Sequence, residues 1–283
     1  MKITFDRTKF LLAILICLQF GRSHAQENRN SIAKKDSCQT TEAFRSFKVS
    51  QTQSTKQAEK GTFYLSTNFR FGSLNKSFDQ LFGMDNITAQ FGVNYGFTKF
   101  FQMGLSRESL GKMITLSSKF RIYQKGGNFP LNLSIYGSYN FRGVKHVSQE
   151  TPYFSANGIF FQPIISTKLF NRLSIQLSPS FMKMNDIGIL VFENESSYAL
   201  SVSSAYWINK RASIFLDYST NLNRHQNSPY TDVLSLGAEI EFQKNLFRFL
   251  ISNSSFNDDI SSILTGEKDR LYIGVNYLRE FHH

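Results

Sequence analysis

The sequence predicts an all-β chain: an antiparallel transmembrane β-barrel of about twelve strands, with short periplasmic turns and long extracellular loops. Two observations carry this prediction. Apolar and polar residues alternate with period two along about twelve stretches, and the connections between the stretches alternate between short and long. A third observation, an export signal at the start of the chain, fits a protein that leaves the cytoplasm.

The first 25 residues have the three parts of a secretory signal peptide. Lys2, Arg7 and Lys9 form a basic start, residues 10–18 are an apolar run, and Ala25 ends a small-x-small cleavage pattern. The run is too short to cross a bilayer as a helix, which needs about 20 residues. We expect a signal peptide over 1–25, a flexible periplasmic N-terminal arm over 26–60 and an outer-membrane β-barrel over 61–283.

The arm is assigned from its composition. Residues 26–60 are rich in Ser, Thr, Gln and Lys and show no sustained periodicity, which is typical of disordered chain. Cys38 is the one cysteine left after cleavage, so the mature protein can form no internal disulfide. We expect it to be a spare thiol in the arm.

The barrel strands follow from alternation such as Leu131, Leu133 and Ile135 on one face against Asn132 and Ser134 on the other. The strands are predicted at 62–71, 87–97, 100–107, 113–124, 129–142, 157–169, 172–182, 196–208, 211–219, 232–243, 246–255 and 270–281. The last of them is an apolar and aromatic strand, which resembles the terminal signal read by the outer-membrane assembly machinery.

A soluble β-sandwich would also show alternation, so the connections decide between the two folds. Tight turns lie between residues 97 and 100, 124 and 129, 169 and 173, 208 and 212, and 242 and 247, and they alternate with connections that are longer, except at 108–112. Along the predicted strands, only Arg107 and Arg279 lie on the apolar face, both at strand ends where a long side chain can reach headgroups. Aromatic residues gather at the turn ends, Trp207 among them, as in an interfacial girdle.

The composition excludes other classes. The chain has a formal net charge of +11, but the charges are scattered rather than gathered into a basic stripe, which argues against a nucleic-acid partner. We find no metal-ligand cluster and no phosphate-binding glycine loop, and therefore expect no cofactor and no metal. The expected partners are outer-membrane lipid, lipopolysaccharide and, during biogenesis, the barrel-assembly machinery, with the protein a monomer.

Several motifs point to a family. Residues 68–72 (NFRFG) are followed by 81–87 (LFGMDNI), 91–96 (FGVNYG), 104–107 (GLSR) and 111–112 (GK). This spacing resembles an uncharacterised family of outer-membrane β-barrel proteins of Bacteroidota, known as a domain of unknown function. The position of Asn68 is often His in that family, so the match is not complete. The resemblance implies an outer-membrane barrel and brings no assigned activity or catalytic residues.

Charges that the register places inside the barrel are the first candidate site. Two interpretations are open. The charges line a polar channel for small solutes with a mild anion preference, or they pair with one another and plug a narrow interior. Glu241 and Arg248 are expected to pair across the hairpin between 242 and 247. The candidate lumen-facing residues are Arg70, Lys119, Arg121, Arg142, Lys168, Asp217, Glu239, Glu241 and Arg248.

Two loops are further candidates. Leu74, Phe78, Leu81 and Phe82 share one face of a short helix, which would either gate the barrel mouth or pack on its rim. In the last long loop, the acidic residues could bind calcium, but their spacing matches no calcium-loop signature, and a solvated loop is the better interpretation. These acidic residues are Asp258, Asp259, Glu267 and Asp269.

One catalytic alternative remains. Asn223, His225 and Ser228 faintly resemble the Asn, His and Ser of outer-membrane phospholipases, which are also twelve-stranded barrels. The longer motif around these residues is absent here, and a polar loop contains such residues by chance. The leading hypothesis is therefore a non-enzymatic barrel, either a narrow channel for small solutes or a structural envelope barrel, with a lipid hydrolase as the alternative.

Overall fold

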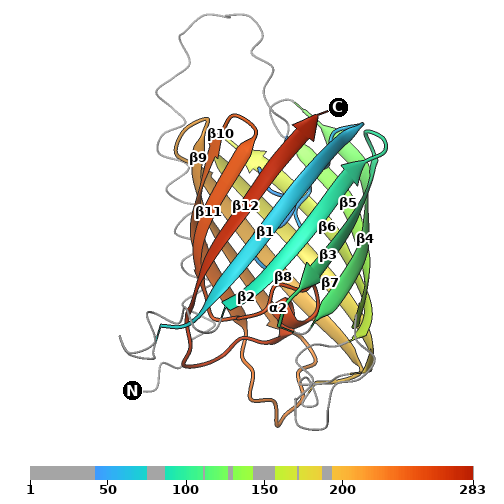
Figure 1. Ribbon diagram of the computed structural model, residues 1–283, viewed down its shortest axis with the longest axis vertical. Helices are drawn as coiled ribbons and strands as arrows, with labels where there is room; N and C mark the ends of the chain where they lie inside the picture. Colours follow the sequence, from blue (N-terminus) through green and yellow to red (C-terminus); the bar gives the residue numbers. More distant parts are fainter. Residues whose placement is uncertain are drawn as a thin grey trace, which may run out of the picture. The chain divides into compact units, whose positions relative to one another are not determined.

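The computed structural model describes residues 42–74, 87–110, 112–126, 130–142, 157–170, 172–186 and 193–282. Twelve antiparallel strands in these residues form a closed barrel, with each strand hydrogen-bonded to its neighbours in chain order (Figure 1). The first and last strands pair with each other and close it. The strands are β1 (Thr62–Ser73), β2 (Ile87–Gly96), β3 (Phe101–Glu108), β4 (Met113–Lys125), β5 (Leu131–Arg142), β6 (Asn157–Leu169), β7 (Leu173–Asp186), β8 (Ser196–Trp207), β9 (Ala212–Asn221), β10 (Val233–Phe242), β11 (Asn245–Ser252) and β12 (Tyr272–His282).

The predicted fold class is thus confirmed. The largest difference from the predicted strand bounds is at the end of β7, which continues to Asp186 instead of ending near residue 182. The extension places Lys183 on the outer face, so the outer face carries an exposed charge there in addition to Arg107 and Arg279. The expected signal peptide, Cys38 and most of the expected gate residues lie outside the described residues.

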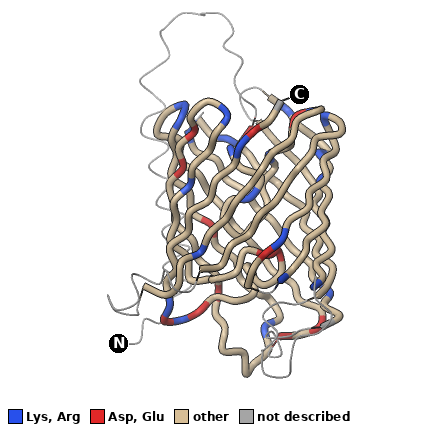
Figure 2. The backbone as a smooth tube through the Cα atoms, viewed as in Figure 1, with Lys and Arg blue, Asp and Glu red and all other residues tan. Residues whose placement is uncertain are grey.

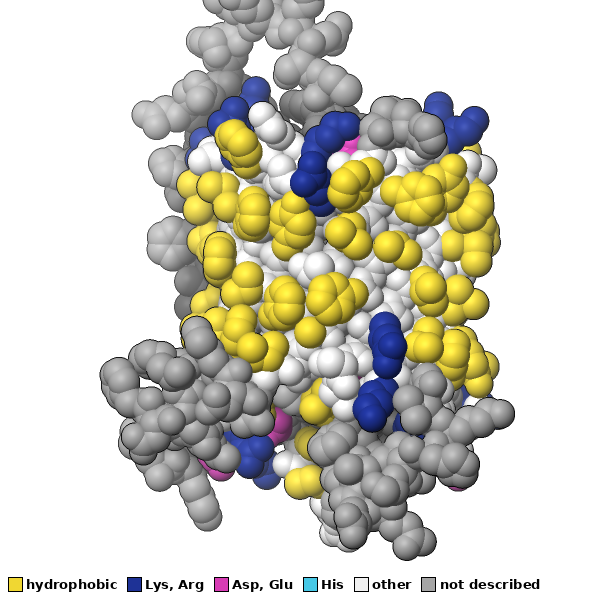
Figure 3. Space-filling model, in the orientation of Figure 1, with side chains coloured by type: hydrophobic (Ala, Val, Ile, Leu, Met, Phe, Trp, Pro, Cys, Tyr) yellow, Lys and Arg dark blue, Asp and Glu magenta, His cyan; other side chains and the backbone are white. Residues whose placement is uncertain are grey.

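The barrel wall is built from the period-two alternation. On β6, Ile159 and Ile165 are 51% and 43% exposed on the outer face, while Gln162 and Ser166 point inward and are buried. Figure 3 shows apolar side chains over the middle of the visible outer face, with Lys and Arg near its two ends. This distribution suits a hydrocarbon layer around the wall with headgroups at either rim. No helix among the described residues is long and apolar enough to cross a membrane.

A charge on this outer face should be costly in a depth-dependent way. Leu177 lies near the middle of β7 and is 44% exposed, whereas Ile208 lies beside a tight turn and is 57% exposed. We expect Leu177→Arg to destabilise the barrel by about 2–4 kcal/mol and Ile208→Arg by about 0–1 kcal/mol. Reversible urea unfolding in lipid bilayers measures both. Equal costs for the two variants would contradict a lipid-facing wall.

Trp207 is not part of an outer aromatic girdle. It lies on the inward-facing register of β8, and its indole Nε1 donates to Ser174 Oγ at 3.0 Å. The alternation explains the position, because Tyr206 takes the outward place next to it and is 45% exposed.

The β10–β11 connection also differs from the expectation. Phe242 faces Asn245, so the turn holds only two residues and the register sets Arg248 opposite Glu239, not Glu241. Arg248 Nε lies 3.1 Å from Glu239 Oε2. The prediction that Glu241 and Arg248 pair across this hairpin was wrong by one inward-facing position, because the turn is shorter than the alternation alone suggested.

Candidate functional site: the occupied lumen

The lumen contains a part of the chain that precedes β1. Residues 42–60, which we call the lumen hairpin, belong to the same compact unit as the barrel, and most of them are buried. Ser54 N donates to Phe47 O at 2.8 Å and Val49 N to Thr52 O at 2.7 Å, so the segment reverses direction at residues 49–52. This corrects the expected flexible periplasmic arm over 26–60: from residue 42 onward the chain is packed inside the barrel.

Both ends of the lumen hairpin lie at the same end of the barrel, where the tight turns are. On the first arm, Arg45 Nη1 donates to the carbonyl of Lys210 in the β8–β9 turn at 2.8 Å. On the second, Ala58 N donates to Gln102 Oε1 at 2.6 Å, close to the β2–β3 turn. A side chain at Gly96 would collide with the backbone of Glu59 where the second arm passes. The hairpin therefore occupies the lumen without threading through it.

Charged side chains of the wall hold the hairpin by its backbone. The fully buried carboxylate of Asp217 accepts from the amides of Ser50, Gln51 and Thr52, with Oδ2 at 2.9, 3.0 and 3.1 Å. Charge-assisted bonds of this kind are roughly twice as strong as neutral ones. They compensate for the cost of burying a carboxylate.

Lys119 is the cationic counterpart on β4. Its ammonium group is fully buried and donates to the carbonyls of Phe47, Ser54 and Lys56 at 3.2, 2.9 and 3.2 Å. Arg248 of β11 donates to the carbonyl of Lys48 at 2.7 Å and also to that of Val49. β4 on one side of the barrel, and β9 and β11 on the other, thus each contribute one charge that binds main-chain groups of the hairpin.

Apolar contacts also hold the hairpin in the lumen. Phe44 and Val49 of the hairpin pack with Phe215 and Leu250 of the wall. Phe47 packs with Leu246 and, edge to face at 4.9 Å between ring centroids, with Tyr64. These wall residues are inward-facing, and a water-filled pore would leave them solvated.

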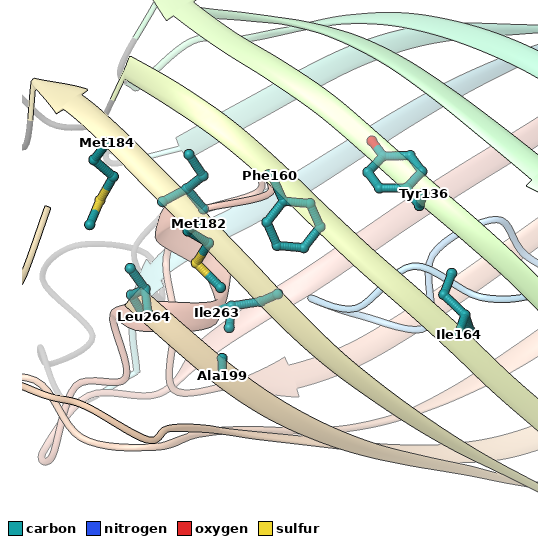
Figure 4. Packing of buried hydrophobic residues seen from close by; sticks show 9 residues of the cluster. Tyr136, Phe160, Ile164, Met182, Met184, Ala199, Ile263 and Leu264 are labelled. Atoms are coloured by element: carbon teal, nitrogen blue, oxygen red, sulfur yellow. The ribbon is translucent and has the colours of Figure 1, made fainter. Parts of the chain in front are cut away.

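A second segment fills the lumen from the opposite end. Residues 253–271, which we call the lumen loop, connect β11 to β12 and include the short helix α2 (Ser261–Leu264). Ile260, Ile263 and Leu264 are fully buried and pack on Phe160 and Met182 of the wall. Figure 4 shows the loop residues Ile263 and Leu264 facing these side chains of β6 and β7. The expectation that this loop is solvated holds for only part of it. Asp258 and Asp259 are buried, while Asp269 is exposed.

The two segments meet at Asp259. Its Oδ2 accepts from Tyr136 Oη at 2.6 Å and from Ser138 Oγ at 2.7 Å, which fixes the carboxylate to β5. Its Oδ1 accepts from Gln53 Nε2 of the hairpin at 3.1 Å and lies 3.4 Å from Lys48 Nζ. One carboxylate therefore joins the hairpin, the loop and the wall near the middle of the lumen.

A cavity lies on one side of the lumen hairpin. A cavity of about 80 Å³ is lined by small polar side chains of β1 to β4, together with Lys48, Arg248 and Asp259. The wall residues Ser66, Asn68, Asn94, Ser106 and Ser117 are only half-buried, whereas the inward side chains of β6 and β7 are all buried. The cavity is polar and large enough for water, so a narrow wet space runs beside the hairpin.

The structure places the candidate lumen charges as follows. Arg70, Lys119, Lys168, Asp217, Glu239 and Arg248 are buried inside, and Arg121 and Glu241 are partly exposed at the tight-turn end. Arg121 pairs with Glu42 at 2.5 Å and Glu241 with Arg45 at 2.5 Å, so their partners come from the hairpin. Arg142 ends β5 and is half-buried. Sequence reasoning missed Glu108, a fully buried inward residue just beyond the predicted end of its strand.

The residues of the catalytic alternative are not arranged as a catalytic site. Ser228 Oγ donates to Glu193 Oε1 at 2.6 Å, and His225 Nδ1 accepts from the amide of Asn227 at 3.2 Å. Burial raises the pKa of the Glu193 carboxyl, although the hydrogen bond from Ser228 and the positive charge of Arg224 act in the opposite direction. The amide of Asn223 ties the loop to β8 through Ser196 O and Tyr198 N. Acyl transfer needs the base to hydrogen-bond the nucleophile, which this arrangement does not provide.

The expected gate loop is described only at Leu74, which is half-buried and donates its amide to Leu271 O at 2.8 Å. Phe78, Leu81 and Phe82 lie outside the described residues. Among the described residues, no group of His, Cys, Asp and Glu could hold a metal ion.

A closed barrel with an apolar outer face and a polar, occupied lumen defines a membrane-bound β-barrel protein. Residues 44–280 match the family model of the membrane-bound β-barrel domain DUF5777, and the chain belongs to this family. The match begins inside the lumen hairpin, so the family domain includes it.

Solved outer-membrane barrels are similar to this chain. The KdgM porin is 9% identical with a TM-score of 0.51, over 77% of this chain and 99% of that chain. The COG4313 outer membrane channel from Pseudomonas putida F1 is 11% identical with a TM-score of 0.47, over 80% and 97%. Outer membrane phospholipase A from Escherichia coli is 10% identical with a TM-score of 0.44, over 77% and 89%. At an identity this low, the likeness to the KdgM porin shows the fold alone. No curated protein sequence matches the chain.

The single tryptophan offers a direct optical readout of the hairpin. Trp207 lies between two cations, with Arg45 of the hairpin 4.0 Å and Lys168 of the wall 3.4 Å from the ring centroid. Removing residues 42–58 should expose the indole to water, with red-shifted emission and stronger acrylamide quenching. Arg279→Ala, which removes a cation stacked on Phe281, is the control and should leave the spectrum unchanged. Identical spectra for deleted and full-length chains would contradict the position of the hairpin.

Proposed function

We propose that the protein is a non-enzymatic, narrow channel of the bacterial outer membrane that the lumen hairpin holds closed. The observation that carries the proposal is that the lumen hairpin, a segment separate from the wall, fills one half of the polar lumen, with both its ends at the tight-turn end of the barrel. Such a segment can withdraw without breaking any strand pairing. Wall side chains fill the interior of a barrel of about eight strands, whereas twelve strands enclose a wider lumen, in which a separate segment can act as a gate.

The solute class is small and polar. With the hairpin withdrawn, the tight-turn half of the wall presents Lys119, Arg121, Lys168 and Arg248 against Asp217, Glu239 and Glu241. The other half carries Arg70 and the acidic side chains of Glu108, Asp258 and Asp259. We expect a weak anion preference, smaller than the wall charges alone would give, because the lumen loop brings carboxylates into the pathway.

The location and source belong to the same proposal. We infer that residues 1–25 are a cleaved signal peptide, that the mature chain inserts into the outer membrane as a monomer, and that the source is a member of the Bacteroidota. The export signal and the porin-like fold support the location, and the motifs around residues 68–112 support the source.

Single-channel recording of the full-length chain in planar bilayers tests the proposal. We expect a closed baseline with rare resolved openings. A full-length chain and a hairpin-deleted chain that are both electrically silent would instead establish a structural envelope barrel. Hydrolysis of diacyl phospholipids that is lost in Ser228→Ala would establish the hydrolase, and activity indifferent to that change would dismiss it.

A further inference from the structure

Basic residues form a ring at the tight-turn end of the barrel. Each of the five tight turns has an exposed Lys or Arg in it or at its edge. Figure 2 shows Lys and Arg along this rim, which is the upper one in the view. We call these residues the basic ring: Lys99, Lys125, Arg172, Lys210, Arg211 and Lys244.

Few acidic residues neutralise the ring. Among the described residues at this end, Glu59 is exposed, Glu42 and Glu241 are paired with Arg121 and Arg45, and Glu280 lies 3.7 Å from Lys244. The opposite end differs, since its described loops mix Lys112, Lys268 and Arg270 with Glu195, Glu267, Asp269 and Asp232. The described part of the barrel is therefore asymmetric in charge, and its excess of positive charge lies at the tight-turn rim.

Exposed apolar side chains stand next to the ring. Phe97 and Phe100 flank Lys99, Phe170 precedes Arg172 by two residues, and Phe242 precedes Lys244 by two. Phe100 is 61% and Phe170 is 76% exposed. An aromatic ring at the acyl boundary with a cation beside it is the arrangement by which a membrane protein meets the headgroup region.

We propose that the basic ring binds the anionic headgroups of phospholipids in the leaflet that surrounds the tight turns. The cations lie close to the phosphates, and the neighbouring Phe side chains enter the acyl boundary. The ring thereby recruits acidic phospholipid and fixes the depth of this rim in the bilayer. The attraction acts within about one Debye length, so it weakens with salt.

Electron paramagnetic resonance of spin-labelled lipids tests the proposal on the full-length chain. Spin-labelled phosphatidylglycerol should associate with the protein several-fold more strongly than spin-labelled phosphatidylcholine, and high salt should abolish the difference. In a ring variant with Lys99→Gln, Arg172→Gln, Lys210→Gln and Lys244→Gln, the difference should also disappear.

The matched control removes four exposed cations near the other end: Arg107→Gln, Lys112→Gln, Lys183→Gln and Lys268→Gln. It should keep the selectivity of the unmodified chain. Equal association of the two lipids with the unmodified protein would overturn the proposal, and so would an equal loss in both variants. An anionic periplasmic polymer as the true partner would give the first of these results. If the ring variant fails to fold, the salt dependence of the unmodified chain decides.

Discussion

Deletion of residues 42–58 is expected to convert a closed barrel into a conducting one. The deletion removes the segment that Asp217, Lys119 and Arg248 hold in the lumen, but none of the strand pairs that close the barrel. Planar-bilayer recording should show small, resolved unitary steps. The steps stay small because the lumen loop still occupies the other half of the lumen.

A graded series of variants identifies the gate. Shortening the lumen loop over residues 254–268 should leave the channel closed while the hairpin remains, and combining both deletions should give larger steps than the hairpin deletion alone. Heat-dependent gel mobility shows that each variant has folded. Openings in the loop-shortened chain together with silence in the hairpin-deleted chain would assign the gate to the loop instead.

The second large effect is expected from Asp217→Ala. This change removes the acceptor for three backbone amides of the hairpin and for Thr52 Oγ1 at 2.8 Å. A buried donor left without a partner costs about 1–3 kcal/mol. We expect hairpin docking to weaken by about 3 kcal/mol, which lowers the docked-to-undocked ratio about a hundredfold.

Hydrogen exchange measured by mass spectrometry checks this prediction. Amides of residues 47–54 should lose protection in Asp217→Ala, while those of the strands keep it. Ser219→Ala is the control, because Ser219 lies on the same face of β9 but bonds to the wall residue Ser201 at 2.7 Å. Unchanged protection of the hairpin in Asp217→Ala would show that the carboxylate does not hold it.

The barrel and its lumen charges were predictable because strand alternation is a local property. Period two assigns each side chain to a face from its immediate neighbours alone, so strands such as β5 and β8 follow from short stretches of sequence. Which residues face each other across two strands depends on the turn as well as on the alternation. The Glu241–Arg248 expectation failed by one inward-facing position because a two-residue turn, not the alternation, sets the register there.

The lumen hairpin was missed for a different reason. Its partners are charges on β4, β9 and β11, which are far away in sequence, and its own composition resembles that of disordered chain. A signal was nevertheless present on the wall. Phe160, Ile164, Phe215 and Leu250 are apolar residues on the face that should be polar, and they are the surfaces on which the loop and the hairpin pack. Apolar residues on the inner face of a predicted barrel therefore indicate a plug.

The central claim is that the hairpin occupies the lumen of the barrel in the membrane, and a disulfide cross-link tests it most directly. Thr52 Oγ1 and Ser203 Oγ are 3.0 Å apart, so cysteines at both positions should be close enough to bridge. In a Cys38→Ser background, Thr52→Cys/Ser203→Cys should form an intramolecular disulfide in isolated membranes, seen as a gel shift that a reductant reverses. Two free thiols that stay unlinked under an oxidant, in a folded barrel, would contradict the account.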